Sequence, residues 1–392
     1  MLIIALVKGV PSRSTKVVRV DNIVQRNEME MIVNPNDEKA IEAADYLKRR
    51  VGGKIVTLSM GPDVRLKPVL MPLYNAEATG VDEEMILSDP RLAGSDTVAT
   101  SYAVGLAVFK IYEKHIAPFD ALIKLITGGS SMQEIEAKAR ELYDQNVLPN
   151  KVYNEDPGDR TSMIGHLVEG NLSRDEAVAR LKTERANVTR FVIVAGIRTS
   201  DGETGSVGPQ VAEVVSQKMG IELPHATYVE ELDVDPDSLR IHAGRRIGRS
   251  IQRLEMESPV LMTFAPEYVA KTIQSVDFDR VIENYYKGKI KEPIKWTADI
   301  LEADPARLGF GGSAVIVGPA IMMGAPSGQK TLGKSVVFTR KAEKTAWEGK
   351  EYGPFEKGDV ADALPQTLKD DLTAKGALTT FTLAMLGAEL LA

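Results

Sequence analysis

The chain has 392 residues, of which 26% are charged and 43% hydrophobic, and its formal net charge at pH 7 is −7. It contains no cysteine, which excludes disulfide scaffolds, thiolate zinc sites, cysteine nucleophiles and Cys-ligated iron–sulfur clusters. Its four histidines show no HxxH or HExxH spacing, so we predict no metal site. The acidic balance argues against a nucleic-acid partner, because nucleic-acid binders normally carry a basic surplus.

The sequence has only weak features of a membrane-spanning helix or a signal peptide. No stretch reaches the ~18 uninterrupted apolar residues that a spanning helix needs. The first apolar run lacks the basic flank of a signal peptide, so we expect a cytoplasmic protein without a direct membrane span. The apolar residues 376–392 are interpreted as a docking helix; the alternative, a membrane anchor, is disfavoured by their short length and missing basic flanks.

Apolar runs alternate with helical patterns over the first half of the chain. Residues 2–7 have the character of a parallel strand that is covered on both faces. Alanines and a leucine recur at helical spacing between residues 40 and 47, and Gly52 follows where a left-handed cap is expected. This alternation predicts an α/β fold with a Rossmann-like parallel sheet and helices on both faces. In chain order we predict strands at 2–7, 16–20, 54–59, 85–88, 121–126 and 191–195, a turn at 34–37 and a helix at 96–112.

Residues 127–189 differ in character from their surroundings. Two capping-box patterns are each followed by helical spacing, and a turn-like stretch at 154–159 separates them. We therefore predict a small helical insertion. Its capping boxes are at 131–134 and 173–176, and its helices at 135–143 and 177–182.

The alternation fades after about residue 265, where glycine-rich pieces appear, although residues 335–339 have the composition of one more strand. We therefore predict an α/β domain at residues 1–265 and a C-terminal arm and extension at 266–392 that contacts partner subunits.

The most informative stretch is at residues 191–213, FVIVAGIRTSDGETGSVGPQVAE. A strand runs into a loop of small and polar residues and then into an amphipathic helix. Small residues let backbone N–H groups approach a ligand, hydroxyls add donors, and a helix N-terminus favours an anion. The pattern predicts a phosphate or pyrophosphate seat at the carboxyl end of a parallel strand. The alternative is an ordinary turn, since the loop matches neither Walker A nor GxGxxG.

Other loops follow strands that end at the same edge of the sheet, at residues 7–9, 34–37 and 59–62. Asn34 and Asp37 are candidates to contact an adenine or ribose, although they could simply cap the helix that follows. Gly61 is a candidate for close approach of an adenine to the backbone, or else makes a turn.

These residues carry a resemblance. The run AGIRTSDGETGSVGPQVAE is similar to the nucleotide-binding loop of electron-transfer flavoprotein β subunits, whose pattern is GxQAIDGDTxQVGPxxAE. LVKGVP, VNPNDEKAIEAADYLK, TLSMGP and LGFGGS match in the same order, over roughly residues 1–125 and 190–315. The resemblance implies the family's fold, which is Rossmann-like (adenine nucleotide α-hydrolase-like), and a heterodimer with an α subunit that carries its own FAD.

The family contains two kinds of β subunit. One binds AMP structurally; the other, bifurcating kind binds a second FAD and takes a hydride from NADH. Val10-Pro11-Ser12 resembles the VPDT of the bifurcating kind, and residues 87–101 resemble its SDxxxxGxDTxATS pattern. This match implies that Asp96, Thr97 and Thr100 lie beside a flavin, although Asp96-Thr97 could also be an ordinary helix N-cap.

The resemblance implies an electron-transfer subunit whose flavin, rather than any catalytic side chain, performs the chemistry. It implies FAD, or alternatively AMP, in the β site, with NAD as hydride donor and ferredoxin or a dehydrogenase as electron partner. Backbone N–H groups of residues 202–208 would hold the pyrophosphate, while Asn34, Asp37 and Met60 would frame the adenosine. The implied site residues are Leu6, Val7, Asn34, Asp37, Met60, Gly61, Asp96, Thr97, Thr100, Gly196, Arg198, Asp201, Gly202, Glu203, Thr204, Gly205, Ser206 and Val207.

The sequence departs from the family pattern at several positions. Arg198-Thr199-Ser200 replaces Gln-Ala-Ile, Glu203 replaces Asp, and Ser206 and Ala314 replace Gln and Pro. Arg198 either neutralises a pyrophosphate, tunes a flavin or is a solvated loop residue.

Three interpretations of function stay open. The first is a bifurcating β subunit, as part of an NADH-dependent oxidoreductase complex. The second is a conventional β subunit with AMP, which docks dehydrogenases. The third is a nucleotide-sensing module of the stress-protein type. The insertion and the C-terminal extension are either docking surfaces for further subunits of a larger redox complex or lineage-specific additions.

Overall fold

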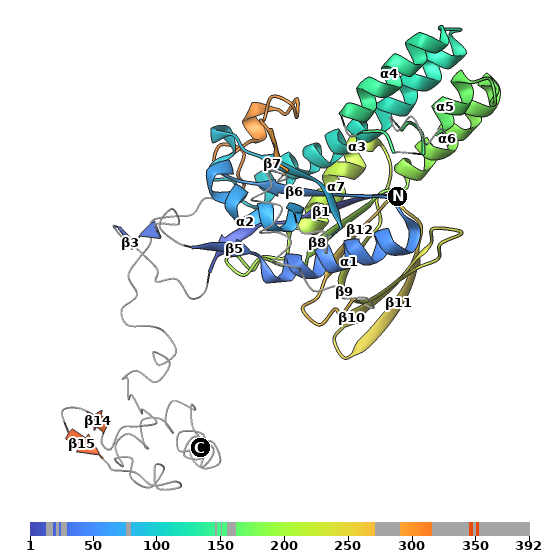
Figure 1. Ribbon diagram of the computed structural model, residues 1–392. Coiled ribbons are helices and arrows are strands. Elements are labelled where there is room, and N and C mark those ends of the chain that lie inside the picture. The colour runs from blue at the N-terminus through green and yellow to red at the C-terminus, as the bar shows by residue number, and fades with distance from the viewer. Residues whose placement is uncertain are drawn as a thin grey trace. The chain divides into compact units, whose positions relative to one another are not determined.

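The computed structural model describes residues 1–12, 19–20, 23–24, 30–75, 80–145, 147–149, 151–154, 162–270, 291–315, 345–347 and 350–352 (Figure 1). One compact unit comprises residues 1–20 and 24–318. A second unit, residues 21–23 and 319–392, contains the short antiparallel pair β14 (Thr345–Trp347) and β15 (Lys350–Tyr352). The predicted strand at 335–339 and helix at 376–392 lie outside the described residues.

A nine-stranded sheet forms the centre of the first unit, in the order β11-β10-β9-β12-β8-β1-β6-β7-β13. Every ladder from β9 to β13 is parallel, and β10 runs antiparallel to both of its neighbours. The strands are β1 (Leu2–Leu6), β6 (Lys54–Met60), β7 (Val81–Leu87), β8 (Val192–Gly196), β9 (His225–Val234), β10 (Ile241–Ile247), β11 (Ser250–Met256), β12 (Val260–Phe264) and β13 (Ile294–Trp296). The predicted α/β class and parallel sheet are thus confirmed, as are the strands near 2–7, 54–59, 85–88 and 191–195.

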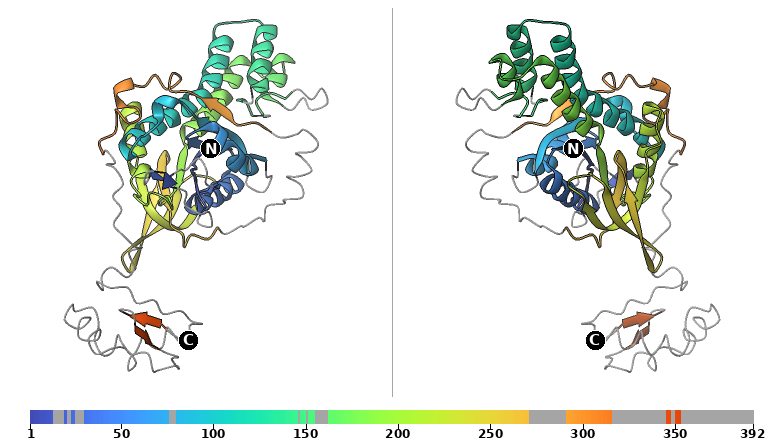
Figure 2. Two further views of the ribbon diagram at one scale, coloured as in Figure 1. Left: turned by 90° about the vertical axis from the view of Figure 1, so that its left-hand side faces the viewer. Right: turned by 90° about the vertical axis from the view of Figure 1, so that its right-hand side faces the viewer.

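Helices cover both faces of the sheet (Figure 2). β1 shows why, because all five of its residues are buried. Ile3 and Ala5 pack in one core with α1 (Pro35–Val51) and α2 (Asp63–Asn75). Leu2 and Ile4 pack in a second core with α3 (Thr97–Thr127) and α7 (Val207–Met219).

The prediction of a strand at 121–126 is wrong, because this stretch is the last part of the 31-residue helix α3. A short apolar run has no periodicity that separates a strand from a buried helix segment. Here Leu122 and Ile126, one helical turn apart, are both buried, together with Phe119. The helix expected at 96–112 is confirmed and continues further.

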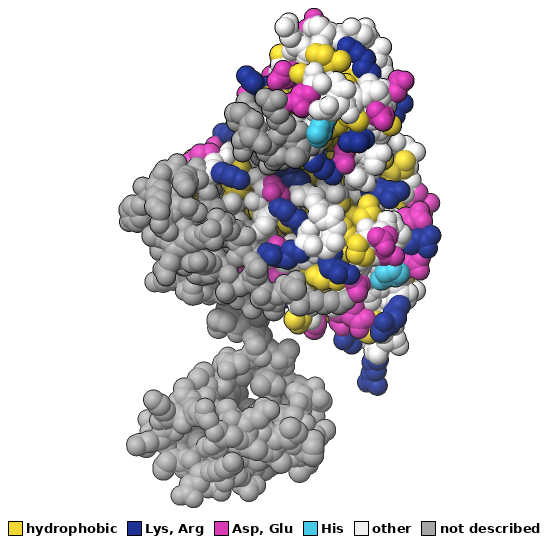
Figure 3. Space-filling model, turned by 45° about the vertical axis from the view of Figure 1, so that its right-hand side comes forward, with side chains coloured by type: hydrophobic (Ala, Val, Ile, Leu, Met, Phe, Trp, Pro, Cys, Tyr) yellow, Lys and Arg dark blue, Asp and Glu magenta, His cyan; other side chains and the backbone are white. Residues whose placement is uncertain are grey.

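The predicted helical insertion has a hydrophobic core of its own. It consists of α4 (Met132–Asp144), α5 (Met163–Val168) and α6 (Arg174–Thr189), and both predicted capping boxes are formed. Phe119, Leu122 and Ile126 of α3 belong to this core, whereas Ile111 belongs to the core under the sheet. Pro118, inside α3, lies between the two groups. On the face drawn in Figure 3, basic and acidic side chains are interspersed. Most of the turn expected at 154–159 lies outside the described residues.

Several short elements lie outside the nine-stranded sheet and the helices, and one of them, β4, begins at Ile23 of the second unit. They are β2 (Gly9–Pro11), which pairs with β5 (Met31–Val33), then β3 (Arg19–Val20), β4 (Ile23–Val24), and the 3-10 helices η3 (Pro90–Leu92) and η4 (Pro305–Arg307). Of the strand expected at 16–20, only β3 falls among the described residues. None of the described helices combines the length and apolar character needed to cross a bilayer. The division at residue 265 stays a prediction.

Candidate functional site

The sheet has a topological switch point between β1 and β8. The chain leaves β1 toward β6 and β7 on one side, whereas β8 is followed in the sheet by β12 and β9 on the other. In open α/β sheets, ligands bind in the crevice outside the carboxyl ends of the strands at such a point. The residues that would border such a crevice here are in the turn after β1, the start of α1 and the β8–α7 loop, residues 197–206; we call this expected region the crevice.

Asp37 joins the ends of the two central strands. Its Oδ2 accepts a hydrogen bond of 2.8 Å from the backbone N–H of Lys8, and its Oδ1 accepts one of 3.1 Å from Gly196. The side chain is buried, and burial raises the pKa of Asp37 to about 7 against the opposing effect of these hydrogen bonds. Its carboxylate therefore serves as a joint between strands rather than as a helix cap.

Asn34 fixes the first half of the β8–α7 loop. Its Nδ2 donates to the carbonyl of Arg198 at 3.0 Å, and its Oδ1 accepts from the N–H of Ser200 at 3.1 Å. Asn36 donates a second hydrogen bond, of 2.8 Å, to the Arg198 carbonyl. Because Asn34 is completely buried, its contribution to a ligand site is to shape this loop.

An ion pair closes the same group of loops at the surface. Lys8 Nζ lies 2.8 Å from each carboxylate oxygen of Asp201. The Lys8 side chain is 44% exposed and that of Asp201 16%. The sequence interpretation named the turn that contains Lys8 but missed its role, which no local pattern could have revealed because the partners are 193 residues apart.

The second half of the β8–α7 loop presents backbone to solvent. Residues 201–204 are exposed, and Glu203 and Gly205 have left-handed φ values of 53° and 65°. α7 then begins at Val207, and Ser206 at its N-cap makes no side-chain capping hydrogen bond. The Ser206 side chain therefore does not cap the first turn, whose N–H groups at Val207 and Gly208 are candidates to meet an anion.

Close packing brings the start of α7 down onto the sheet. A Cβ atom on Gly208 would lie 2.6 Å from Cγ2 of Thr263 on β12. Gly196 is equally confined, since a Cβ there would lie 2.5 Å from Oδ1 of Asp37. Glycine at both positions permits the approach that forms the crevice.

The turn after β6 borders the crevice on its other side. Ser59 Oγ donates to the carbonyl of Val7 at 2.7 Å, and the N–H of Gly61 donates to the Leu87 carbonyl at 3.0 Å. Gly61 has a φ of 153°, and Met60 is half-buried. The side chains of Leu6 and Val7 are buried in the two hydrophobic cores.

Asp96 caps α3 and ties it to the C-terminal arm. Its Oδ1 accepts from the N–H of Ala99 at 2.9 Å, while Oδ2 accepts from Ala314 and Val315 at 2.8 and 2.9 Å. Although burial opposes it, this set of backbone hydrogen bonds lowers the pKa of Asp96. The capping alternative is thus formed, while Thr97 and Thr100 lie half-buried in the first turn.

The N-termini of α3 and α7 lie side by side. Ser101 Oγ is 3.0 Å from Gln210 Oε1 and 3.4 Å from the carbonyl of Val207. The arm also packs on this end of α3, because the Asp304 N–H donates to the Tyr102 hydroxyl and Arg307 stacks 3.8 Å from the Tyr102 ring centre. The predicted residues on α3 and on the β8–α7 loop are therefore brought to one end of the sheet.

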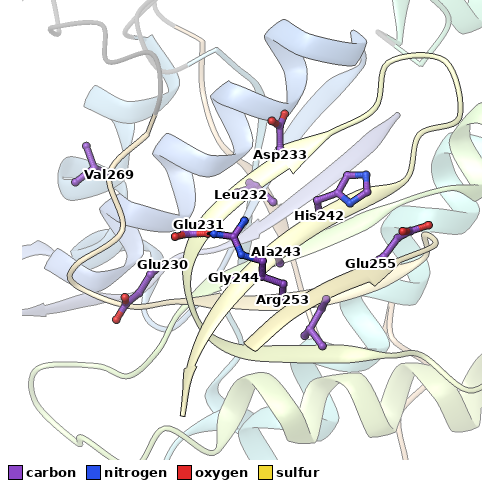
Figure 4. A pocket seen from close by; sticks show the side chains of 11 residues that line it. Glu230, Glu231, Leu232, Asp233, His242, Ala243, Gly244, Arg253, Glu255 and Val269 are labelled. Carbon is purple, nitrogen blue, oxygen red and sulfur yellow. The ribbon is translucent and has the colours of Figure 1, made fainter. Parts of the chain in front are cut away.

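A separate hollow of about 650 Å³ lies on the antiparallel end of the sheet (Figure 4). It is lined by residues of β9, β10 and β11, including Glu231, His242 and Arg253, and by Val269. None of the predicted site residues lines it.

Comparison with known proteins shows what the chain is similar to. A family model described as "Electron transfer flavoprotein domain" matches residues 21–116. The electron transfer flavoprotein subunit beta of Clostridium acetobutylicum is 27% identical over 316 residues, which cover 80% of this chain and 85% of the relative. The corresponding subunit of Megasphaera elsdenii is 28% identical, with 80% and 84% covered. Protein FixA of Rhizobium meliloti is 24% identical over 352 residues, with 89% of each chain covered.

The chain is thus similar to electron transfer flavoprotein β subunits over 80% of its length. The resemblance predicted from the sequence is thereby confirmed, and so is a role in electron transfer. Similarity to these β subunits also implies an α-subunit partner. The nucleotide contacts of individual residues stay a prediction.

Proposed function

We propose that this β subunit binds FAD in the crevice between β1 and β8 and acts in flavin-based electron bifurcation. The observation that carries the nucleotide site is the start of α7, where Ser206 makes no side-chain cap and the loop in front is exposed and glycine-containing. Backbone N–H groups within residues 202–208 would hold the pyrophosphate, apart from that of Glu203, which donates to the Thr199 carbonyl. Asp37 and Asn34 would not contact the nucleotide; their hydrogen bonds to Gly196 and Ser200 would hold the β8–α7 loop in place.

The flavin end of the nucleotide would lie toward α3. In support, the first turns of α3 and α7 are in contact through Ser101, and Thr97 and Thr100 are half-buried there. A bound FAD would supply the redox chemistry, taking a hydride from NADH and passing single electrons to the α-subunit flavin and to a low-potential acceptor such as ferredoxin. This chain's own residues would bind and orient the cofactor. Asp96 would contribute by holding the N-terminus of α3 rather than by direct contact.

A conventional β subunit with AMP is the second candidate. One observation favours it. Both carboxylate oxygens of Asp96 already accept hydrogen bonds from backbone N–H groups, so the residue that the resemblance places beside a flavin is not available to bind one. In that case the nucleotide would be structural, and the subunit would dock dehydrogenase partners.

A ligand count separates these candidates. The chain is purified with its α partner, the ligands are released with acid, and FAD and AMP are counted per heterodimer. Two FAD and no AMP are expected for the bifurcating function. One FAD with one AMP would overturn it in favour of the conventional subunit. ATP as the sole ligand would contradict both the bifurcating and the conventional function, and would favour a nucleotide-sensing module of the stress-protein type instead.

The interaction partners beyond the α subunit follow from the same proposal. We expect ferredoxin or a dehydrogenase as electron partner, and further subunits of a larger redox complex on the insertion α4–α6 and on the extension after residue 315. Pull-down of the full complex with and without the insertion tests the first of these surfaces.

A further inference from the structure

The ion pair between Lys8 and Asp201 joins the two loops that flank the proposed nucleotide site. Both carboxylate oxygens of Asp201 lie 2.8 Å from the Lys8 ammonium nitrogen. Exposed ion pairs contribute little to stability, because two mobile side chains must be held in one geometry. The position of this pair at the mouth of the crevice suggests an electrostatic role instead.

Hydrogen bonds hold the backbone around both residues of the pair. The N–H of Lys8 donates to Asp37, and its carbonyl accepts from the N–H of Asn34 at 2.9 Å. On the opposite side, Ser200 is held by Asn34, and the Glu203 N–H donates to the Thr199 carbonyl at 2.9 Å. The two charges are therefore held together by the loops that carry them.

The pair also neutralises one of the two acidic side chains in the β8–α7 loop. Asp201 and Glu203 are both acidic, and both lie directly before the helix start that would receive a phosphate. Although partial burial opposes it, the hydrogen bonds and charge of Lys8 lower the pKa of Asp201, so its carboxylate is ionised. An uncompensated carboxylate at this place would repel an anionic ligand.

We propose that Lys8 is a positioning residue for the nucleotide, which acts through Asp201: it cancels the charge of that carboxylate and holds it away from the phosphate seat. This inference rests on the proposed function, since it takes the β8–α7 loop as the binding site for the nucleotide phosphates. It distinguishes Lys8 from a direct phosphate ligand. If Lys8 were a direct ligand, replacing it would weaken nucleotide binding whether or not Asp201 is present. If Lys8 only compensates a charge, replacing it would weaken binding only while Asp201 is present and ionised.

A double-mutant cycle tests this distinction. Lys8→Gln, Asp201→Asn and the double variant are prepared as complexes with the α partner, and FAD and AMP are each titrated into β-site-stripped protein. We expect Lys8→Gln to weaken binding by about tenfold, through exposure of the Asp201 charge. We expect Asp201→Asn to tighten binding by about threefold, and the double variant to return to within about threefold of wild type.

Salt provides a readout that a purely structural role would not move. The loss in Lys8→Gln should shrink between about 50 mM and about 500 mM NaCl, because salt screens repulsion between exposed charges. Lys138→Gln, which removes the lysine of the remote pair with Glu141, is the matched control and should leave affinity unchanged.

Two outcomes would overturn the inference. One is a double variant as weak as Lys8→Gln, which would make Lys8 a direct ligand. The other is wild-type affinity in Lys8→Gln. Failure of the proposed function itself looks different: stoichiometric nucleotide would then remain even in Gly205→Glu, which places bulk and charge in the loop.

Discussion

The carboxylate of Asp37, at the start of α1, accepts a hydrogen bond from the backbone of Gly196, at the end of β8, 159 residues away. The same side chain accepts another from Lys8 at the end of β1. One buried residue thus holds the two central strands together where the nucleotide crevice begins.

Asp37→Ala should destabilise the protein by about 2–4 kcal/mol, because it leaves two partly buried N–H groups without an acceptor. Asp37→Asn keeps one acceptor oxygen and should lose less. Urea unfolding at pH 7 measures both variants. Equal stability of Asp37→Ala and wild type would show that the joint contributes nothing.

Gly205→Glu should abolish binding of the β-site nucleotide, because a carboxylate enters the phosphate seat at a left-handed backbone position. Gly220→Glu is a matched control, since Gly220 ends the same helix with a φ of 67°, close to the 65° of Gly205, and has open space around it. Both substitutions strain the backbone alike, so only the first should reduce the nucleotide released by acid. Retained stoichiometric nucleotide in Gly205→Glu would mean that the loop is misassigned.

Asp96→Ala should cost about 2–3 kcal/mol of stability, since it removes a helix cap and also two hydrogen bonds to the arm. Ser131→Ala removes the capping side chain of α4 and should cost only about 1 kcal/mol. Chemical denaturation compares the two. If the loss in Asp96→Ala were no larger than in Ser131→Ala, the contacts with residues 314 and 315 would carry no weight.

Glu84 should make stability depend on pH. It lies on β7 opposite Thr57, and its buried carboxyl oxygens have no hydrogen-bond partner among the described residues. Burial raises the pKa of Glu84 from 4.5 to about 8, so the folded protein binds this proton more tightly than the unfolded chain does. Its effect on stability is therefore constant below pH 4.5 and becomes unfavourable as the pH rises through the interval up to about 8.

Glu84→Gln removes that proton and tests the effect. Relative to wild type, the variant should gain stability with increasing pH, by up to about 1.4 kcal/mol per pH unit between the two pKa values. Urea midpoints at pH 5 and pH 8 suffice, because other titrating groups cancel in the comparison. A difference between the proteins that stays constant with pH would contradict the assignment.

β1, β6, β8 and the end of β7 were predictable because their buried residues appear as apolar runs. β9 and β10 were missed for the converse reason. In β9, buried Val229, Leu232 and Val234 are interleaved with charged residues. β9 and β10 pair with each other antiparallel, although β9 is also parallel to β12. β12 is just as completely buried as β1 but was not predicted. The strand at 121–126 was predicted wrongly because the hydrophobic core of the insertion buries the apolar residues at the end of α3.

The sequence placed the candidate site residues at one edge of the sheet, but it did not reveal their contacts with one another. Loops at the carboxyl ends of strands identify the crevice, since topology alone brings them together. The pairings of Asp37 with Gly196 and of Lys8 with Asp201 join positions 159 and 193 residues apart, and only the folded chain reveals them. As a result, Asn34 and Asp37, expected as ligand contacts, are found to shape the loop.

α3 is a single rod of about 46 Å, from the 1.5 Å rise per residue, that passes from the crevice into the insertion. At Pro118, between the two cores that the rod connects, the helix lacks one backbone hydrogen bond. Bending stiffness is therefore lowest at that turn. Any bend between the insertion and the sheet is therefore expected at that turn, rather than at the end of the helix that Asp96 caps.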